Sequence, residues 1–456
     1  MTMLKRKKRQ LAALILAAGR GERMNSDVVK VLHKAAGKSL IEHVLGAVRS
    51  AGVTQIAVVV GTRNRKDIRQ KLSSPLMGED KGGGDNPPIL AFPHKGGRKI
   101  KVTFIEQKVR LGTGHAVLQA KSEFQNWPGD LLVSPADAPC IRFETIRDLV
   151  TTHCKSGAVA SILTADVNDP SGYGRILRRG EDVIGIREHL DASNDERKIT
   201  EINSGIYVFN AQKLFSKLLS IKQNSKKKEY YLTDVIEAFV RAGHSVRAHK
   251  IDDANEILGV NTRKELSVVH QILNEREIKR HAQAGVTILD PHQTVISKGV
   301  KIGKDTVIHP FTWIESDVII GGRCEIGPFA KIRSGSKIDD DVVIGSFVEV
   351  VRTKIGSKTL VKHLTYLGDA QVGKNVNVGA GSITANFNGK TKNKTIIRDG
   401  AFIGCDTIFI APVTVGKRVK TGAGAVLPAG QNIPAGKTVV GIPAKLVEKH
   451  KRKKTK

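Results

Sequence analysis

An aliphatic or aromatic residue recurs at every sixth position through most of the C-terminal third of the chain. The uninterrupted run comprises Ile302, Ile308, Ile314, Ile320, Ile326, Ile332, Ile338, Ile344 and Val350. The same spacing returns in Val372 and Val378, in Ile397, Ile403, Phe409 and Val415, and in Leu427, Ile433 and Val439. Neither an α-helix, with a period of 3.6, nor a strand, with a period of 2, accounts for it. A triangular parallel β-helix does, because each of its three short faces takes six residues and points one of them toward the axis, giving coils of about 18 residues.

The N-terminal part of the chain alternates short apolar runs with stretches of helical spacing. The apolar runs cover residues 11–16, 56–60, 102–105, 131–133 and 158–164. This alternation is typical of an α/β sheet domain, which we expect over residues 11–263. Residues 264–283 have helical spacing and contain neither Gly nor Pro, so they predict a linking helix before a β-helix domain at 284–443.

Three segments have the composition of irregular structure. Residues 75–100 are rich in Gly and Pro and predict a long surface loop. Residues 1–10 and 446–456 carry runs of Lys and Arg, which are most simply interpreted as solvated, disordered tails.

The charge balance is strongly basic. Lys and Arg number 74 against 44 Asp and Glu, which gives a net charge of +30 over 456 residues. Such an excess suits small anionic substrates such as phosphates. Nucleic-acid binding is disfavoured, because aromatic residues make up only 4% of the chain and no stacking or zinc motif accompanies the charge.

Cysteine usage and hydropathy indicate a cytoplasmic location. Cys140, Cys154, Cys324 and Cys405 are scattered without CxxC spacing, which predicts reduced thiols and no metal cluster. Nothing resembles a signal peptide, and no stretch approaches the roughly 20 apolar residues that a membrane span needs.

A Gly-containing turn directly follows the first apolar run, in the sequence LILAAGRGERM of residues 14–24. Gly and Ala let the backbone approach a ligand closely, and free N–H groups at the start of a following helix attract anions. The turn is neither a Walker A motif nor GxGxxG. Alone, it is equally well explained as a tight turn without a ligand.

Further motifs, taken in order, give the chain a family resemblance. AAGRGERM (17–24) is followed by KVLH (30–33), Gln107, LGTGHA (111–116), SGYGRI (171–176), REH (187–189), EINSGI (201–206), EYYLTD (229–234) and VNTR (260–263). This series, followed by a hexapeptide β-helix, resembles the bifunctional N-acetylglucosamine-1-phosphate uridylyltransferase/glucosamine-1-phosphate N-acetyltransferases. The resemblance covers about residues 11–443. It implies an α/β, Rossmann-like nucleotidyltransferase domain followed by a left-handed parallel β-helix of hexapeptide repeats.

The resemblance assigns the first reaction to the α/β domain. There the sugar phosphate attacks UTP, pyrophosphate leaves, and UDP-N-acetylglucosamine forms for peptidoglycan and lipopolysaccharide synthesis. Asp137 and Asn261 would hold Mg²⁺, which prefers such oxygen ligands, and Arg23 and Lys30 would hold and polarise the phosphates. The implied nucleotide and sugar residues are Leu16, Ala17, Ala18, Gly19, Lys30, Gln107, Gly112, Thr113, Asp137, Gly174, Glu188, Asn203 and Asn261. Exposed basic residues are otherwise usually just solvated, so the roles of Arg23 and Lys30 depend mainly on the match.

The resemblance assigns a second reaction, N-acetylation of glucosamine-1-phosphate by acetyl-CoA, to the β-helix. Residues 362–369 (KHLTYLGD) interrupt the six-residue spacing, and an interruption of a regular pattern often marks a functional site. His363 would be the general base that takes the proton of the attacking amine. The implied sugar-phosphate residues are Arg333, Tyr366, Asn377 and Lys392; those for acetyl-CoA are Ala380, Asn386, Phe387, Cys405 and Ala423.

Several positions depart from the family pattern. In the first domain, Val29 stands where Pro is usual and Ala136 where Gly is usual; in the second, Phe387-Asn388 replaces Tyr-Asp and Cys405 replaces Ser. The sharper changes are Val351, where the family has a phosphate-binding Lys, and Val440-Gly441, near which a late Arg is missing; Lys445 is a possible substitute for that Arg. Arg352 cannot simply replace the Lys without a local bulge, because neighbours in a strand point to opposite faces.

Three functions therefore remain open. The first is the bifunctional enzyme, using UTP, acetyl-CoA and both sugar phosphates, and forming a homotrimer as its relatives do. The second is a uridylyltransferase whose β-helix has weakened or lost acetyl transfer and serves as a trimerisation scaffold. The third is a scaffold with both sites silent, which the retention of Asp137, Asn261, Lys30 and His363 disfavours.

Overall fold

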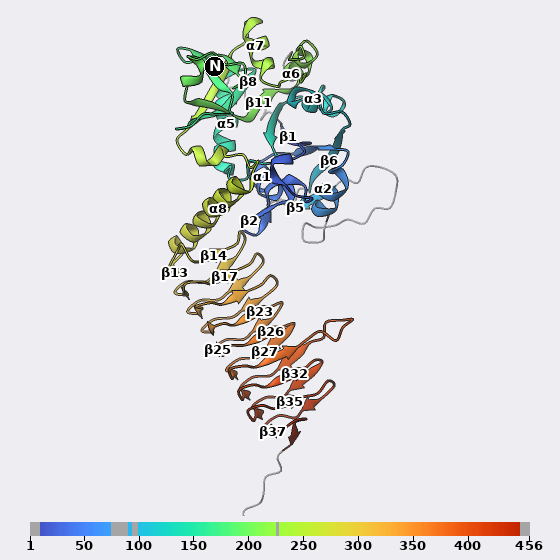
Figure 1. The fold of residues 1–456 in the computed structure, drawn as a ribbon, viewed down its shortest axis with the longest axis vertical. Helices are drawn as coiled ribbons and strands as arrows, with labels where there is room; N and C mark the ends of the chain where they lie inside the picture. Colours follow the sequence, from blue (N-terminus) through green and yellow to red (C-terminus); the bar gives the residue numbers. More distant parts are fainter. Residues whose placement is uncertain (1–9, 74–89, 94–98, 225–227, 447–456) are drawn as a thin grey trace, which may run out of the picture. The chain divides into compact units, whose positions relative to one another are not determined.

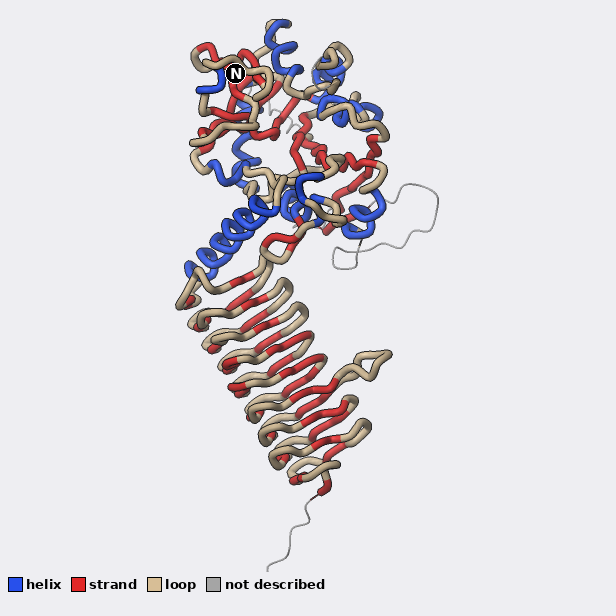
Figure 2. Tube along the Cα trace, in the orientation of Figure 1, coloured by secondary structure: helices blue, strands red, loops and turns tan. Residues whose placement is uncertain are grey.

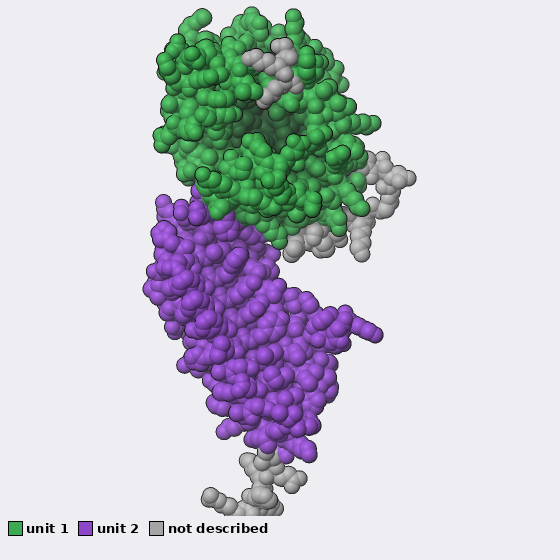
Figure 3. All heavy atoms as spheres, in the orientation of Figure 1, with its two compact units in different colours: residues 1–35, 39–269 green, residues 36–38, 270–456 purple. Residues whose placement is uncertain are grey.

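The structure is a computed structural model that describes residues 10–73, 90–93, 99–224 and 228–446. The predicted basic tails, apart from Gln10 and Leu446, and most of the predicted 75–100 loop lie outside the described residues. The chain forms two compact units (Figure 3): unit 1 is Met1–Ala35 with Ser39–Val269, and unit 2 is Ala36–Lys38 with His270–Lys456. The helix α8 (Arg263–Gln283) contributes residues to both. In the described ranges, we find no helix with the length and apolar character needed to cross a membrane.

Unit 1 is built on a mixed sheet in the order β10-β9-β11-β7-β1-β4-β6-β5, with β8 and β12 attached through β11 (Figure 1). Its strands are β1 (Leu11–Ala17), β4 (Gln55–Gly61), β5 (Leu90–Pro93), β6 (Lys99–Gln107), β7 (Asp130–Pro135), β8 (Ala160–Asp166), β9 (Arg175–Arg179), β10 (Asp182–Arg187), β11 (Glu201–Asn210) and β12 (Val246–Ile251). The central strands β7, β1, β4 and β6 are parallel. Their carboxyl ends therefore meet along one edge, the edge at which open α/β sheets bind ligands.

Helices cover both faces of this sheet because alternate strand residues point to opposite sides. Ala13 and Ile15 pack in one apolar cluster with residues of α1 (Leu40–Ser50), α2 (Arg65–Leu72) and α5 (Phe143–Ser156). Ala12 and Leu14 pack in another, with residues of α3 (Thr113–Leu118), α4 (Lys121–Phe124), α6 (Ala211–Leu218) and α7 (Asp234–Arg241). Shorter elements are β2 (Lys34–Ala35), β3 (Lys38–Ser39) and the 3₁₀ turns η1 (Glu22–Met24), η2 (Lys30–Leu32), η4 (Glu196–Lys198) and η5 (Ala254–Ile257).

Unit 2 is a left-handed β-helix of three flat parallel sheets, here called faces 1 to 3 (Figure 2). Face 1 comprises β13 (Thr287–Ile288), β16 (Val307–Ile308), β19 (Glu325–Ile326), β22 (Val343–Ser346), β25 (Leu360–His363), β28 (Asn377–Val378), β31 (Phe402–Ile403), β34 (Lys420–Thr421), β37 (Thr438–Val440) and, antiparallel at its end, β38 (Lys445–Leu446). Face 2 comprises β14 (Val295–Ile296), β17 (Trp313–Ile314), β20 (Lys331–Ile332), β23 (Glu349–Val351), β26 (Tyr366–Gly368), β29 (Ile383–Ala385), β32 (Ile408–Ile410) and β35 (Val426–Leu427). Face 3 comprises β15 (Lys301–Ile302), β18 (Ile319–Ile320), β21 (Lys337–Ile338), β24 (Lys354–Ile355), β27 (Ala370–Val372), β30 (Thr395–Ile397), β33 (Val413–Val415) and β36 (Asn432–Ile433). The predicted fold class is confirmed.

The six-residue spacing seen in the sequence corresponds to the inward positions of these strands. Ile314, Ile332 and Val350 stack in register on face 2, and each is fully buried. The residues at the corners, also six apart, adopt the left-handed conformation that a tight bend needs, from Asp305 (φ 62°) and Phe311 (φ 58°) onward. Sequence period and bend period are therefore the same.

The six-residue spacing is interrupted around residues 362–369, as the sequence indicates, but the β-helix itself is not. Val361 and Leu367 occupy inward positions and are fully buried. Two successive coils are each one residue shorter between face 2 and face 3, so that Ile355 follows Val350 and Val372 follows Leu367 at five positions rather than six. The spacing is shifted, but the coil is complete.

The coil that contains residues 386–394 does depart from the regular size. Ala370 pairs with Thr395, 25 positions later, whereas Thr395 pairs with Val413, 18 positions later. The extra residues form a loop that projects from face 2, closed by a bridge between Phe387 and Lys392 (Figure 2).

We predict that Ile338→Ala destabilises the β-helix by about 2–5 kcal/mol, because it removes a buried side chain that neighbouring coils cannot replace. Ile338 is 1% exposed in β21. The measurement is chemical denaturation of a Trp127→Phe background, in which Trp313 of β17 reports on unit 2. Lys337→Ala, at the adjacent outward position, is the control and should change stability by no more than about 0.5 kcal/mol. Equal effects of the two substitutions would contradict the assignment of inward positions.

Candidate active sites

A cavity of about 900 Å³ lies in unit 1 at the carboxyl ends of β1, β6 and β7. The predicted nucleotide-site residues that line it are Leu16, Ala17, Ala18, Gly19, Arg23, Lys30, Gln107, Gly112, Thr113, Asp137, Glu188, Asn203 and Asn261. Gly174 does not line it; its carbonyl accepts a hydrogen bond from the backbone N–H of Asn203 at 2.8 Å. The chain thus gathers residues that are more than 200 positions apart around one space of the size that small-molecule sites have.

Two oxygen ligands in this cavity face the same cation, the ammonium of Lys30. Lys30 donates a hydrogen bond to the carboxylate Oδ2 of Asp137 and another, of 3.1 Å, to the amide Oδ1 of Asn261. Lys30 is only 9% exposed, so the pair is poorly screened by water. Both oxygens therefore face the same position in the cavity, where a cation already lies.

The donor set fits Mg²⁺ better than a metal that needs an all-protein cage. In the described parts of the chain, no three His, Cys, Asp or Glu side chains are grouped so as to hold a metal. Mg²⁺ typically uses one or two protein oxygens and completes its shell with water and substrate phosphates. One carboxylate and one amide oxygen beside a cavity with room for a phosphorylated ligand match that requirement.

The backbone around these ligands is fixed by several hydrogen bonds. The N–H of Val260 donates to the carbonyl of Asp137 at 2.8 Å, which joins the two ligand loops. The carboxylate of Glu265 accepts from the N–H groups of Asn261 and Thr262 at 2.6 and 2.7 Å, and the N–H of Glu265 donates to the Thr262 hydroxyl. This reciprocal pair is a capping box at the start of α8. Asn261 is therefore held by the end of a helix.

Gly21 determines where the side chain of Lys30 lies. Gly21 has a φ of 70°, in the left-handed region. A Cβ atom at this position would lie 2.6 Å from the Cβ of Lys30. The glycine is therefore required both by its conformation and by the close approach of the lysine stem.

The loop that carries Lys30 is also anchored to α8. The guanidinium of Arg263 donates to the carbonyl of Met24 at 3.1 Å and lies 3.3 Å from Nδ1 of His33. Burial, and after it the charge of Arg263, lowers the pKa of His33. A neutral imidazole is compatible with the neighbouring cation.

The wall formed by residues 111–114 pairs with the chain near residue 231. Gly114 N–H donates to the Tyr230 carbonyl at 2.8 Å, and Leu232 N–H donates to the Thr113 hydroxyl at 3.1 Å. Gly112 has a φ of 95°, and a Cβ there would meet the Tyr230 carbonyl at 2.6 Å. Gln107, which is 3% exposed, donates to the Gly112 carbonyl at 3.2 Å. The segment is therefore held in place by hydrogen bonds on both sides.

Other residues of the cavity lining are neutral polar groups and carboxylates. The amide of Asn203 donates to the hydroxyl of Tyr207 at 2.7 Å, and its Oδ1 accepts from Gly205 N–H at 3.0 Å. Burial raises the pKa of Tyr207, so the phenol stays protonated. Glu188 accepts a hydrogen bond of 3.0 Å from Thr233. Hydroxyls, an amide and a carboxylate are the groups that hydrogen-bond sugars.

Several carboxylates lie near Asp234, the first residue of α7. Burial raises the pKa of Asp234 to about 6, and the negative charges of Glu237, Glu188 and Asp191 act in the same direction. Arg187 opposes them.

In unit 2, His363 lies in a column of small residues at the corner between faces 1 and 2. Each member stands two positions after an inward residue of face 1, and the column comprises Ser346, His363, Ala380, Cys405 and Ala423. His363 pairs directly with Ser346. The imidazole is exposed, and within the described residues its ring has no recorded hydrogen bond. The geometry thus aligns the predicted base with three of the predicted acetyl-CoA residues.

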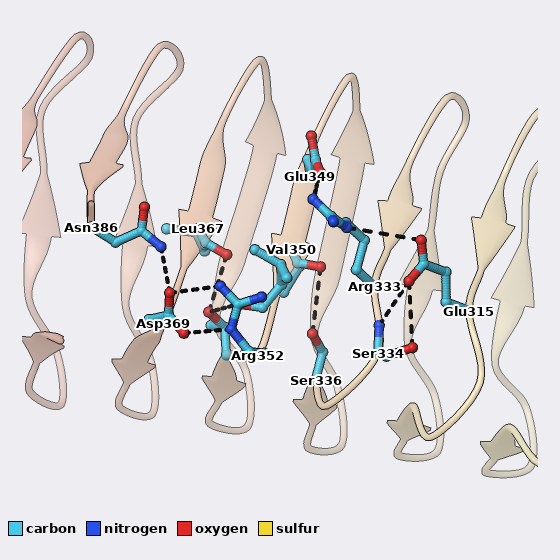
Figure 4. A network of polar contacts seen from close by, with 12 residues as sticks. Glu315, Arg333, Ser334, Ser336, Glu349, Val350, Arg352, Leu367, Asp369 and Asn386 are labelled. Atoms are coloured by element: carbon cyan, nitrogen blue, oxygen red, sulfur yellow. Dashed lines mark hydrogen bonds and ion pairs between the residues drawn. The ribbon is translucent and has the colours of Figure 1, made fainter. Parts of the chain in front are cut away.

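Two of the four predicted sugar-phosphate residues belong to face 2: Arg333 directly follows β20, and Tyr366 begins β26. Arg333 donates to Glu349 at 2.9 Å and lies 3.8 Å from Glu315 (Figure 4). Glu349 is the direct strand neighbour of Tyr366. Arg333 and Tyr366 are therefore two coils apart with a carboxylate between them.

Arg352 is engaged elsewhere and does not replace the lysine that is absent at Val351. Its guanidinium makes a bidentate ion pair with Asp369, at 2.6 and 2.7 Å, and Asp369 also accepts from the amide of Asn386 (Figure 4). Arg352 is itself a corner residue, with a φ of 48°, and its side chain reaches Asp369 from there. Val351 is 2% exposed. The phosphate region of face 2 accordingly has one cation fewer than the family pattern.

The remaining predicted residues of the second site are spread over several positions. Lys392, on the projecting loop, is close enough to contribute to lowering the pKa of Asp369, after the larger effect of Arg352. Phe387 on the same loop is 59% exposed. Asn377 lies on face 1, on the other side of the corner from Tyr366. Lys445 pairs with Val440, which is where the late arginine is missing.

Residues without an assigned role in the sequence also line the first cavity. They are Arg20, Gly21, Glu22, Val31, Arg110, Ala116, Pro135, Gly205, Tyr207, Glu229, Leu232 and Thr233. Gly21, Glu22 and Thr233 belong to the motifs that carry the resemblance, so the sequence could have identified them as cavity residues. Arg110 falls between two motifs, and only the sheet topology reveals it.

A second group, His153, Ser161 and Asp130, has residue types that are common in catalytic sites, but its role is structural. His153 lies 3.0 Å from the hydroxyl of Ser161 and 3.5 Å from Asp130. The side chains of His153 and Asp130 are at most 2% exposed, so no substrate reaches them.

Comparison with known proteins gives the same class as the geometry, a nucleotidyltransferase joined to a hexapeptide-repeat transferase. The nucleotidyl transferase family model matches residues 12–293, and the bacterial transferase hexapeptide model matches residues 317–352. The bifunctional protein GlmU of Acetivibrio thermocellus is 40% identical, over 91% of this chain and 92% of its own. GlmU of Geobacillus sp. is 41% identical over the same shares, and that of Desulfitobacterium hafniense is 36% identical over 93% and 94%.

The chain therefore belongs to the GlmU family of bifunctional transferases. The match extends through both units, so it covers the cavity of unit 1 as well as the corner column of unit 2.

We predict that Gly21→Ala lowers kcat/KM for nucleotidyl transfer by about a hundredfold, because an added methyl group displaces Lys30, and a misplacement of about 1 Å can cost that much. Steady-state kinetics with the nucleotide and sugar phosphate measure the effect. Gly52→Ala is the control: Gly52 also has a positive φ, 91°, but nothing lies within 4 Å of its added Cβ. It should retain activity; a comparable loss in Gly52→Ala would attribute the effect to backbone strain alone.

We predict that the stabilising effect of Asp234→Asn grows with pH. Because the pKa of Asp234 is raised to about 6, the folded chain keeps a proton that the unfolded chain releases above about pH 4. The contribution of this group to stability is therefore present at pH 4 and is lost as pH rises through 6. Asparagine removes the titration, so the melting temperature of the variant minus that of the parent should increase between pH 4.5 and 7.5. A constant difference would refute the raised pKa.

Proposed function

We propose that this chain makes UDP-N-acetylglucosamine in the cytoplasm by two reactions. Unit 2 transfers the acetyl group of acetyl-CoA to glucosamine-1-phosphate, and unit 1 transfers UMP from UTP to the resulting N-acetylglucosamine-1-phosphate. The observation that carries the proposal is that one cavity collects Lys30, Asp137 and Asn261 while a separate corner aligns His363 with Ala380 and Cys405.

In unit 1, positioning and charge neutralisation perform the chemistry. An oxygen of the sugar phosphate attacks the α-phosphorus of UTP, and the bond to the β-phosphate breaks to release pyrophosphate. Both reactants are anions, so Lys30 and Arg23 lower the repulsion between them. The segment at Gln107 and Gly112 holds the base, and Glu188 and Asn203 bind the sugar.

Asp137 and Asn261 are the residues that would hold Mg²⁺, which supplies charge neutralisation of the phosphates. Lys30 shares both oxygens. When the substrate binds, the Lys30 ammonium would therefore give up its hydrogen bond to the Asp137 carboxylate and donate to a phosphate oxygen instead.

In unit 2, His363 takes the proton from the amine as the nitrogen attacks the thioester carbonyl; the thiolate of coenzyme A then leaves and is protonated. The small side chains of Ala380, Cys405 and Ala423 leave room along the corner for the extended thioester arm. Arg333, Tyr366 and Lys392 bind the sugar phosphate, and Asn386 and Phe387 cover acetyl-CoA from the loop.

A homotrimer explains two features of the β-helix. Asn377 and Tyr366 lie on different faces, and neighbouring chains would bring both around one ligand. Along the corner between faces 1 and 2, the rings of Phe311, Phe329 and Phe347 stack, with centroids 4.7 and 5.0 Å apart. These three residues are nevertheless 45–60% exposed. An exposed apolar strip of this kind marks a contact surface.

The second candidate is a uridylyltransferase with a weakened acetyltransferase. It is favoured by Val351, which is buried where a phosphate-binding lysine is usual, and by the engagement of Arg352 with Asp369. Loss of one charge-assisted phosphate contact costs about 1.5–3 kcal/mol, which weakens binding by one to two orders of magnitude.

We predict that both reactions occur in one preparation and are lost separately. With Mg²⁺, UTP and N-acetylglucosamine-1-phosphate, pyrophosphate is released, and Asp137→Ala reduces the rate about a hundredfold or more. With acetyl-CoA and glucosamine-1-phosphate, free thiol is released, and His363→Ala reduces that rate by about 10²–10⁴.

Each variant is the control for the other, since each should retain the reaction of the opposite unit. A parent protein that releases pyrophosphate but no thiol would establish the second candidate. A parent that releases neither would leave only the scaffold.

A further inference from the structure

Three neighbouring parallel strands of unit 1 each end just before an arginine. Arg20 follows β1 by three residues, Arg63 follows β4 by two, and Arg110 follows β6 by three. β1 pairs in parallel with β4, and β4 with β6. The three arginines therefore share the edge of the sheet on which the cavity lies.

Arg110 is the most confined of the three. It lines the cavity together with Arg20, and it is partly buried whereas Arg20 and Arg63 are exposed. Its guanidinium lies over Gly61, the last residue of β4: a Cβ at Gly61 would meet Nη2 of Arg110 at 2.9 Å and the carbonyl of Ala18 at 3.2 Å. The φ of Gly61 is not in the left-handed region, so the close approach of the guanidinium and of the Ala18 carbonyl accounts for the glycine.

The loops beneath these arginines are joined to each other. The amide of Asn64, which is 8% exposed, donates to the carbonyl of Gly19 at 3.0 Å. The N–H of Asn64 donates to the carbonyl of Gly61, also at 3.0 Å. The arginines therefore project from a supported surface.

Their charges are largely unopposed. Within the described ranges, the one ion pair recorded for the three is that of Arg20 with Glu22, at 3.1 Å and exposed. Burial, and after it the like charges of Arg20 and Arg63, lowers the pKa of Arg110. Three like charges with one exposed acid, Glu22, beside them form a site that an anion stabilises.

We propose that Arg110, assisted by Arg20 and Arg63, binds the β- and γ-phosphates of the nucleoside triphosphate. The same contacts hold pyrophosphate until it leaves. This inference rests on the proposed uridylyl transfer. In that reaction the sugar phosphate forms a new bond to the α-phosphorus, and the breaking bond leaves its electron pair on pyrophosphate. The arginines neutralise that charge. They also make the first site select triphosphates over diphosphates.

The test compares Arg110→Gln with Arg69→Gln. Arg69 lies in α2, after the same strand β4, and does not line the cavity, so its substitution removes the same charge without the contact. For Arg110→Gln we expect KM for UTP and the inhibition constant of pyrophosphate to rise about tenfold or more, as for loss of a charge-assisted contact. KM for N-acetylglucosamine-1-phosphate should not change, which also verifies folding. Arg69→Gln should match the parent.

Gly61→Ala gives an independent readout. Its methyl group should displace the guanidinium of Arg110 and raise KM for UTP, and in the double variant Gly61→Ala/Arg110→Gln it should add nothing further. Additive effects, or equal effects of Arg110→Gln and Arg69→Gln, would overturn the proposal.

Calorimetric binding of magnesium pyrophosphate to the full chain separates this inference from the proposed function. If the parent lacks turnover but binds pyrophosphate more tightly than Arg110→Gln does, the proposed function fails and the phosphate site stands. If the parent and Arg110→Gln bind it equally, the phosphate site fails whatever the turnover.

Discussion

Parallel, in-register pairing of strands is the constraint on which both sites depend. In unit 1 it places the carboxyl ends of β7, β1 and β6 along one edge, and the turns that follow them line the cavity. In unit 2 it repeats one corner from coil to coil, so that His363, Ala380 and Cys405 come into line. Parallel pairing thus turns positions that are distant in sequence into neighbours at one end or one corner.

The electrostatics of unit 1 follow from this arrangement. The cavity lining carries both signs of charge: Arg20, Arg23 and Arg110 are cationic, and Glu22, Glu188 and Glu229 are anionic. In the same cavity, Lys30 pairs with Asp137 and Asn261.

Much of the fold could be predicted because periodicity alone specifies it. The spacing of Ile302 to Val350 gave the inward positions of three faces, and the apolar run at 131–133 lies inside β7. The two shortened coils could not be predicted, since the loss of one residue before Ile355 looks the same in sequence as the end of the repeat. Individual side-chain contacts could not be predicted either. Nothing in the order of residues shows that Arg352 binds Asp369, or that the guanidinium of Arg110 lies over Gly61. Those contacts depend on register and on conformation at single corners.

The coil that carries residues 386–394 shows how such a fold can acquire new parts. After the longer excursion from Ala370 to Thr395, the next coil resumes the ordinary spacing, with the inward residues Ile397 and Val415 in register. The root of the excursion is fixed by the bond from Asn386 to Asp369. An insertion at a corner therefore leaves the stack below and above it unchanged, and a β-helix can gain or exchange ligand-covering segments over evolutionary time without redesign of its interior.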